Sequence, residues 1–130
     1  MIELAINTDS RNQMVDVTSI VAGKIPSSFS GIVLIYVPHT TAGVTINEGA
    51  DPDVRRDMIS YLQKLVPHSH SYLHSEGNAD AHIKSSLVGH SVQLIAQAGR
   101  LRLGTWQALY FCEFDGPRTR KIYIEMIKNE

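Results

Sequence analysis

Histidine is unevenly distributed along this chain of 130 residues. Five of the six histidines lie between His68 and His90, and the sixth is His39. Imidazole is the commonest metal ligand in proteins and the one side chain whose unperturbed pKa lies close to neutral pH. The histidines therefore indicate where a metal centre or acid–base chemistry is to be looked for. His68 and His70, which are flanked by serines, are interpreted as solvated loop residues.

The first candidate segment follows an apolar, β-branched stretch at residues 32–37, which predicts a strand buried on both faces. Pro38 ends this stretch, and His39 comes next, before two threonines. Strand ends are places where a rigid scaffold presents reactive groups. His39 shares a face with alternate residues of the stretch, so its ring is expected to lie along an apolar surface, either bonded in the core or acting as a ligand.

The second candidate segment, residues 72–82, is a polar loop that contains a glycine and runs into a predicted helix. His74 and His82 are eight residues apart, and Glu76 lies between them. These side chains could fold around one divalent cation or one phosphate, although their spacing matches no compact zinc motif. The N–H groups at the start of the helix would also receive an anion.

The last third of the chain adds polar residues to predicted strands and turns. A glycine-flanked Arg/Leu alternation indicates a hairpin whose returning strand begins with Trp106, the only tryptophan, followed by Gln107. Gln107 and Glu113 interrupt this apolar strand, and because a buried polar group needs a partner, they are candidates for lining a pocket or an oligomer interface. The cation-rich turn that follows contains Arg118, which could point back at a phosphate.

Three helices and about six strands are expected to position these segments. Capping residues and apolar periodicity place the helices from Asp16 to about Lys24, from Pro52 to the residue before Pro67, and from near Asn78 or Asp80 to about Gly89. In the third helix, Ala79, Ile83 and Leu87 share one face. The strands are expected at residues 2–6, 32–37, 44–48, 92–96, 105–114 and 121–127. This order favours one α+β domain over residues 1–130 with a predominantly antiparallel, sandwich-like core.

The composition narrows the range of partners. Twelve Lys and Arg stand against thirteen Asp and Glu, a balance that gives no cationic footprint for nucleic acid or for an anionic membrane. No apolar run approaches the roughly 20 residues that span a bilayer, so we expect a cytoplasmic protein. Cys112 is the only cysteine, and its apolar surroundings predict a buried, unreactive thiol.

Taken together, these segments resemble the YjbQ-like family, which is also catalogued as a secondary thiamine-phosphate synthase family. The resemblance covers nearly the whole chain. It is carried by four ordered motifs, at residues 39–48, 50–57, 76–82 and 103–107.

The resemblance implies a compact β-sandwich with packed helices that assembles as a homotrimer, with a site near the subunit boundaries. It also implies a weak thiamine phosphate synthase activity, which joins a pyrimidine methyl diphosphate to a thiazole phosphate and releases pyrophosphate. The residues that match the motifs are His39, Asn47, Glu48, His74, Glu76, His82, Trp106, Gln107 and Arg118. His90 departs from the family pattern, so no role is carried over to it.

We therefore hypothesise a histidine-centred site with three groups of residues. His39, His74 and His82 hold a divalent metal, zinc or magnesium, or else a phosphate. Glu76, Glu48 and His82 are the catalytic residues, with Glu76 as general acid and base. The residues expected to bind a small phosphorylated substrate are Asn47, Trp106, Gln107 and Arg118.

Two other functions remain open from the sequence. The same imidazoles could activate a water for metal-dependent hydrolysis of a phosphate ester. Alternatively, the protein could be a non-catalytic oligomeric module that binds a metal or a ligand. Release of phosphate without a coupling partner indicates hydrolysis, whereas tight binding without turnover indicates the module.

Overall fold

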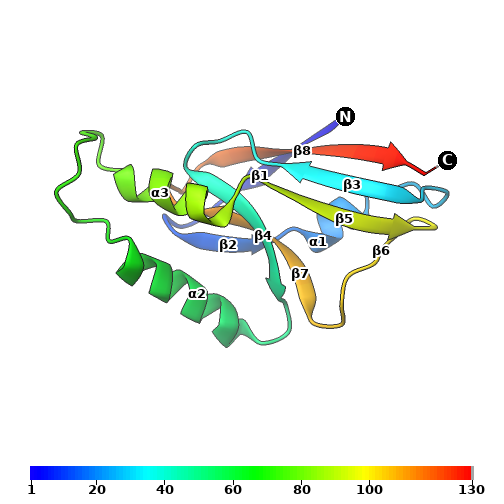
Figure 1. Cartoon of the computed structure of the whole chain (residues 1–130), viewed down its shortest axis with the longest axis horizontal. Coiled ribbons are helices and arrows are strands. Elements are labelled where there is room, and N and C mark those ends of the chain that lie inside the picture. The colour runs from blue at the N-terminus through cyan, green and yellow to red at the C-terminus, as the bar shows by residue number, and fades with distance from the viewer. Residues whose placement is uncertain (130) are drawn as a thin grey trace.

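The computed structural model describes residues 1–129, which form eight strands and three helices (Figure 1). In chain order the elements are β1 (Ile2–Asn7), β2 (Gln13–Asp16), α1 (Thr18–Ala22), β3 (Gly31–Tyr36), β4 (Ala42–Glu48), α2 (Pro52–Leu65), α3 (Ala79–Val88), β5 (Ser91–Gln97), β6 (Arg100–Leu101), β7 (Gln107–Glu113) and β8 (Thr119–Lys128).

The strands form two antiparallel sheets that share a core. The larger sheet has the order β1-β8-β3-β5-β6, and the smaller has the order β2-β7-β4. Val33 and Ile35 from the larger sheet are buried in one cluster with Leu109 and Phe111 from the smaller one. Because alternate residues of each strand point to opposite faces, this packing leaves the other face of each sheet to be covered separately. The predicted α+β fold with a sandwich-like core is confirmed.

Helices α2 and α3 cover the other face of the smaller sheet (Figure 1). Helix α2 begins as its sequence predicts, with Pro52 in the first turn and the Asp51 carboxylate accepting the Asp53 N–H at 2.9 Å. Met58 and Leu62 of this helix pack on a buried cluster of β7 that includes Tyr110. Within residues 1–129, no helix is long and apolar enough to cross a membrane.

Helix α3 packs with the opposite face from the one its apolar residues suggest. Ile83 and Leu87 are exposed, whereas Asp80 and Lys84 are buried. The two buried charges neutralise each other, since Nζ of Lys84 lies 3.0 Å from Oδ2 of Asp80. Gly43 of β4 lets the end of the helix come close, because a Cβ there would lie 2.5 Å from the Gly89 carbonyl oxygen.

The predicted hairpin before Trp106 is wrong in its pairing. Strand β6 pairs back onto β5, with Leu101 opposite Ala96, so the turn lies at residues 98–99. Gly99 has a φ of 78°, a backbone conformation that glycine adopts without strain. The segment after β6 then crosses to the smaller sheet, where β7 begins at Gln107.

Strand β3 is buried on one face only in the single chain, although its sequence predicts burial on both. Val33 and Ile35 are in the core, but Ile32 is exposed on the outer face of the larger sheet. Its cross-strand neighbours, Ile95 and Ile127, are also exposed, at 66% and 53%. The three isoleucines therefore form an open apolar row across β5, β3 and β8.

Candidate functional site

A polar cavity lies where the loop after β3, the turn after β7 and the start of β8 meet the start of α3. It has a volume of about 450 Å³ and is called the arginine–histidine pocket below. Four of the predicted site residues come together here: His39, Glu76, His82 and Arg118. The complete lining is Pro38, His39, Thr40, Thr41, Glu76, Asn78, His82, Asp115, Arg118 and Arg120.

His39 is held by one specific hydrogen bond. The backbone N–H of Lys121 donates to Nε2 of the ring at 3.0 Å. Burial, followed by the positive charge of Arg120, lowers the pKa of His39, so the ring is neutral near pH 7. A neutral ring that accepts at Nε2 carries its proton at Nδ1. His39 therefore offers a hydrogen-bond donor and has no free lone pair for a metal.

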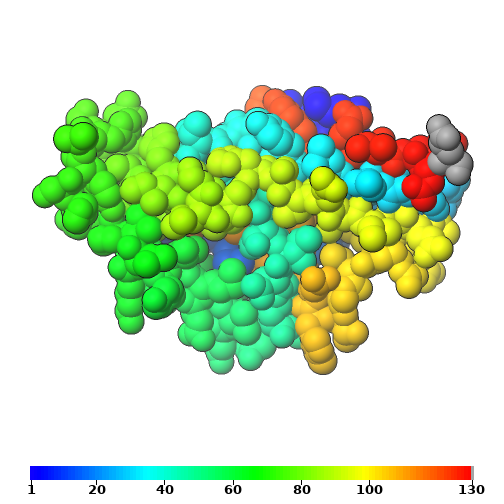
Figure 2. Space-filling view, in the orientation of Figure 1, coloured from blue at the N-terminus to red at the C-terminus, as the bar shows by residue number. Residues whose placement is uncertain are grey.

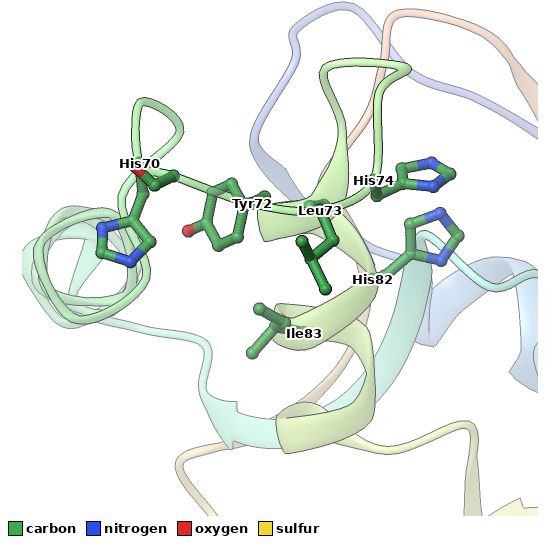
Figure 3. Close-up of a pocket in the computed structure, with 8 residues that line it drawn as sticks. His70, Tyr72, Leu73, His74, His82 and Ile83 are labelled. Carbon is green, nitrogen blue, oxygen red and sulfur yellow. The ribbon is translucent and has the colours of Figure 1, made fainter.

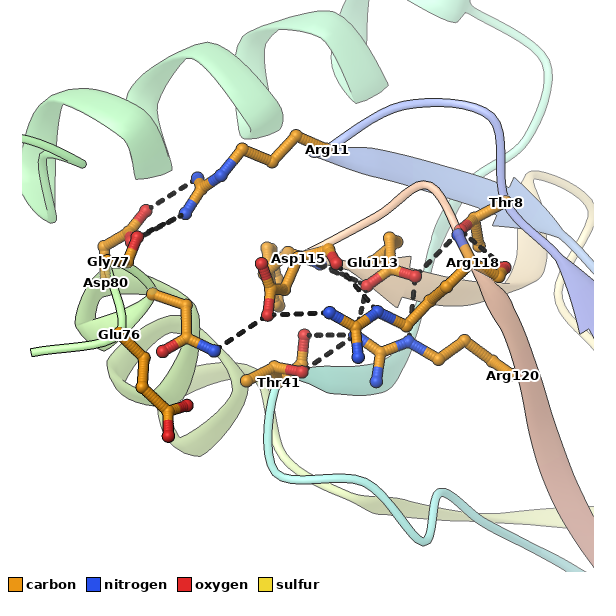
Figure 4. Close-up of polar contacts among 12 residues, drawn as sticks. Thr8, Arg11, Thr41, Glu76, Gly77, Asp80, Glu113, Asp115, Arg118 and Arg120 are labelled. Atoms are coloured by element: carbon orange, nitrogen blue, oxygen red, sulfur yellow. Dashed lines mark hydrogen bonds and ion pairs between the residues drawn. The ribbon is translucent and has the colours of Figure 1, made fainter.

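Arg120, which lines the pocket, forms a buried ion pair with Glu113 (Figure 4). Nε of Arg120 donates to Oε1 of Glu113 at 2.8 Å, and its Nη2 donates to the Thr41 hydroxyl at 2.8 Å. Burial alone would raise the pKa of Glu113, but hydrogen bonds from Arg120, the Asp115 N–H and the Thr8 hydroxyl hold it below its ordinary value. Glu113 is thus an internal partner of Arg120, and its predicted place at a pocket wall or oligomer interface is wrong.

A chain of hydrogen bonds connects the loop before α3 to the turn before β8. His74 donates from Nε2 to the side-chain oxygen of Asn78 at 2.9 Å, which is the donor role because an amide oxygen only accepts. Asn78 in turn donates to Oδ2 of Asp115 at 2.8 Å. The same Asp115 oxygen accepts Nη2 of Arg118 at 3.0 Å. Asn78 and Asp115 therefore fix Arg118 and His74 relative to each other, and sequence reasoning missed both.

His74 and His82 pack against each other, edge to face, with ring centroids 5.1 Å apart (Figure 3). Oε2 of Glu76 lies 3.6 Å from Nε2 of His74, and 74% of the Glu76 side chain is exposed. His82 also lines a second cavity, of about 550 Å³, together with Tyr72, Leu73 and other residues. This second cavity, called the apolar pocket below, adjoins the arginine–histidine pocket at the His82 ring.

The three imidazoles of the hypothesised metal centre do not form a ligand set in the single chain. The Nε2 atom of His39 is occupied by the Lys121 N–H. Among residues 1–129, no group of three or more His, Cys, Asp or Glu side chains is arranged to hold a metal ion. The residues present thus do not fit a three-histidine zinc or magnesium site, and no chemical step below is routed through a metal.

The remaining predicted site residues lie at the other end of β4. Trp106 and Gln107 line a separate cavity of about 370 Å³, and 64% of Trp106 is exposed. Their segment protrudes at the lower edge of the molecule in Figure 2. Glu48 ends β4, six residues after Ala42, and at about 3.3 Å per residue the two strand ends lie roughly 20 Å apart. One chain therefore does not join these residues to the histidines.

Asn47 and Glu48 serve local structure in the single chain. The Asn47 side-chain oxygen accepts the Glu48 N–H at 2.7 Å. The Glu48 carboxylate accepts the Ala50 N–H at 3.1 Å, and its backbone carbonyl accepts the Tyr110 hydroxyl at 2.8 Å. These bonds shape the turn between β4 and α2.

A second buried charge cluster lies beside α3 and was missed from the sequence. The Asp80 carboxylate accepts hydrogen bonds from Nη1 and Nη2 of Arg11 and from Nζ of Lys84, each at 3.0 Å. Burial alone would raise the pKa of Asp80, but its bonds to Arg11, Lys84 and His68 hold it well below its usual range. The four-residue spacing of Asp80 and Lys84 is the one signal that could have revealed the cluster.

His68 and His70 were both expected to be solvated loop residues, and each has a further contact in the structure. His68 is not simply a solvated loop residue, because its Nδ1 lies 3.3 Å from Oδ1 of Asp80. His70 lines the apolar pocket, with its ring 5.0 Å from that of Tyr72.

Cys112 is buried, as its sequence predicts, and burial raises the pKa of its thiol to about 12.

Comparison with known proteins identifies what the chain is similar to. Residues 2–129 match the family described as UPF0047 protein YjbQ-like. UPF0047 protein YugU of Bacillus subtilis is 53% identical over 95% of this chain and 96% of its own length. UPF0047 protein MJ1081 of Methanocaldococcus jannaschii is 52% identical, over 94% and 90% respectively.

Solved structures agree with this comparison. A YjbQ/UPF0047 family protein from Clostridium acetobutylicum superposes with a TM-score of 0.94 at 48% identity, covering 98% of this chain and all of that one. The conserved protein TT1486 from Thermus thermophilus gives a TM-score of 0.93 at 41% identity, again over 98% of this chain and all of that one.

Proposed function

The chain belongs to the YjbQ-like family of UPF0047 proteins, and from this premise we propose that it is a cytoplasmic small-molecule transferase with weak thiamine phosphate synthase activity. The proposed reaction joins a pyrimidine methyl diphosphate to a thiazole phosphate and releases pyrophosphate. One observation carries the proposal: His39, Glu76, His82 and Arg118, distant in sequence, line a single polar cavity.

The charges in this cavity suit the departure of pyrophosphate. As the thiazole ring nitrogen bonds to the methyl carbon and the bond from that carbon to the diphosphate oxygen breaks, negative charge develops on the leaving pyrophosphate. Arg118, held by Asp115 through its Nε and Nη2 atoms, places a cation beside that charge. Donors that are already fixed before the reaction stabilise a developing charge without a reorganisation cost.

Glu76 and His82 are the proposed acid–base residues. Glu76 is exposed at the mouth of the cavity and lies close to His74, so it can exchange protons with solvent between turnovers. His82 lies where the polar and apolar pockets meet, between the expected diphosphate and the expected ring. General acid–base catalysis of this kind contributes about 10²–10⁴-fold to a rate.

We propose that a second subunit completes the site in a homotrimer. Trp106 of the partner subunit would then supply an aromatic wall for the arginine–histidine pocket. Within one chain, Trp106 lies at the opposite end of β4, roughly 20 Å from that pocket. Two facts support an assembly: Trp106 is largely exposed, and the row Ile32, Ile95 and Ile127 leaves an apolar sheet face open. Exposed apolar patches of this kind mark protein interfaces.

The test is a product analysis of the purified, full-length protein with both phosphorylated substrates. Wild type is expected to form thiamine phosphate and pyrophosphate in equal amounts, and His82→Ala to lose this activity. His90→Gln, which changes a histidine outside both pockets, is the matched control and is expected to keep it.

The same assay separates the two other candidate functions. Phosphate or pyrophosphate released at the same rate without the thiazole phosphate would make the protein a hydrolase. Binding of either substrate with turnover at the uncatalysed rate would make it a binding module. In both cases the transferase proposal would be wrong.

A further inference from the structure

Arg120 is a buried cation with one nitrogen left over. Only 3% of this residue is exposed, yet it lines the arginine–histidine pocket. Its Nε and Nη2 atoms donate to Glu113 and Thr41, as the dashed lines in Figure 4 show. Its Nη1 atom donates to no residue among 1–129. No buried side-chain nitrogen or oxygen among the described residues lacks a partner, so this unpaired nitrogen is open to the cavity, where a ligand can accept a hydrogen bond from it.

Two further donors border the same cavity. The Nη1 atom of Arg118 also has no partner in the described chain, since this side chain bonds Asp115 through Nε and Nη2. Nδ1 of His39 carries a proton because Nε2 accepts the Lys121 N–H. The three donors come from three different segments: the loop after β3, the turn before β8, and β8 itself.

The carboxylates of Glu113 and Asp115 are already paired with the two arginines. Both oxygens of Glu113 accept hydrogen bonds from Arg120, and Oδ2 of Asp115 accepts from Asn78 and Arg118. Only Glu76 remains, and its side chain is mostly exposed to solvent. The cavity therefore presents unpaired arginine nitrogens beside carboxylates whose charges are already paired.

We infer that Arg120, Arg118 and His39 form a seat for a phosphate group, which binds the diphosphate end of the substrate directly and without a divalent cation. Donors that reach one cavity from three segments suit a tetrahedral oxyanion with several acceptor oxygens better than a planar carboxylate, which is bound side-on by one guanidinium. The adjoining apolar pocket would take the ring of the same molecule. This assignment rests on the proposed function for its substrate and deepens it by naming the anion-binding residues.

The experiment is calorimetric titration of the full-length protein near neutral pH in the presence of EDTA. Inorganic pyrophosphate and inorganic phosphate are the probes, and malonate is the carboxylate comparison. Both phosphates are expected to bind and malonate to bind at least tenfold more weakly. Because hydrogen bonds to charged groups contribute about 1.5–3 kcal/mol, Arg118→Met and His39→Ala are expected to weaken pyrophosphate binding by roughly 10- to 100-fold.

Two further variants make the test specific. Arg102→Met removes an exposed arginine outside the pocket and is expected to leave binding unchanged. Replacing Arg120 alone would strand the Glu113 charge and unfold the protein, so the double change Arg120→Met and Glu113→Gln is used. This variant is expected to keep its circular dichroism spectrum and to lose pyrophosphate binding.

Three results would overturn the seat: no binding of either phosphate by wild type, binding that requires added magnesium or zinc, or binding that the three pocket variants leave intact. The protein could bind pyrophosphate with the expected variant pattern and yet form no thiamine phosphate. That result would contradict the transferase proposal alone. The seat would then stand as a phosphate site of another reaction.

Discussion

The backbone N–H of Lys121 donates to Nε2 of His39 across 3.0 Å, and this bond determines what His39 can do. It fixes the ring orientation and places the proton on Nδ1, at the edge of a cavity that also contains two arginines. His39, whose position in the sequence suggests a metal ligand, thereby becomes a hydrogen-bond donor that an anion can accept from.

His39 is expected to titrate below the ordinary histidine pKa of about 6.5. Burial and the Arg120 charge both disfavour its protonated form. The unfolded chain therefore takes up this proton first as the pH falls, and stability is lost from about pH 6.5 down to the folded-state pKa. An NMR titration of the ring C–H signals measures the midpoint. A midpoint at or above that of an unfolded peptide would contradict the geometry.

Asp80→Asn is expected to destabilise the protein by about 3–5 kcal/mol, because it leaves Lys84 as a buried charge without a counterion. Chemical denaturation measures the loss, and Asp57→Asn, on the exposed face of α2, is expected to change stability by no more than about 0.5 kcal/mol. Since the pKa of Asp80 is lowered by folding, its contribution is present above the unfolded value and disappears as the pH falls through the folded one. Equal effects of the two changes would show that the cluster is not stabilising.

Ile95→Lys is expected to separate the subunits of the proposed homotrimer. The change puts a charge at one end of the open apolar row on β5, β3 and β8, where a covering subunit would have to desolvate it. Sedimentation velocity should then show the mass of a single chain in place of a trimer. Tyr61→Lys, which alters an exposed apolar residue of α2, serves as the control and should leave the trimer intact. A trimer that survives Ile95→Lys would place the interface elsewhere.

Cys112 is expected to resist thiol reagents in the folded protein. With a pKa of about 12 and a buried side chain, almost none of it is thiolate near neutral pH. Labelling with a chromogenic disulfide should therefore proceed only as fast as the chain opens, and should become rapid in denaturant. Fast labelling without denaturant would show that β7 is accessible from solvent.

Local patterns predicted most of the fold. Helix α2 could be assigned from its cap, its first-turn proline and its apolar period, all of which act within one segment. The packing face of α3 could not, because the burial of Asp80 also depends on Arg11, 69 positions away in sequence. The outer face of β3 was expected to be covered, and in one chain it is open, which is the kind of discrepancy that a partner subunit resolves.

The candidate site was predictable in residue type more than in role. His39, Glu76, His82 and Arg118 were all chosen from the sequence and line one cavity. Arg120 was not chosen from the sequence, and it is buried beside that cavity because Glu113 accepts hydrogen bonds from two of its nitrogens. Pairings of this kind depend on how the two sheets pack together, because β7 and β8 belong to different sheets, and no short motif encodes that packing.

The most direct test of the central claim is the rate of pyrophosphate release from the pyrimidine methyl diphosphate, measured with and without the thiazole phosphate. The account predicts release that depends on the thiazole phosphate, yields one thiamine phosphate for each pyrophosphate, and falls roughly 100-fold or more in Glu76→Gln. Release at the uncatalysed rate, or at a rate that ignores both the thiazole phosphate and Glu76, would contradict it.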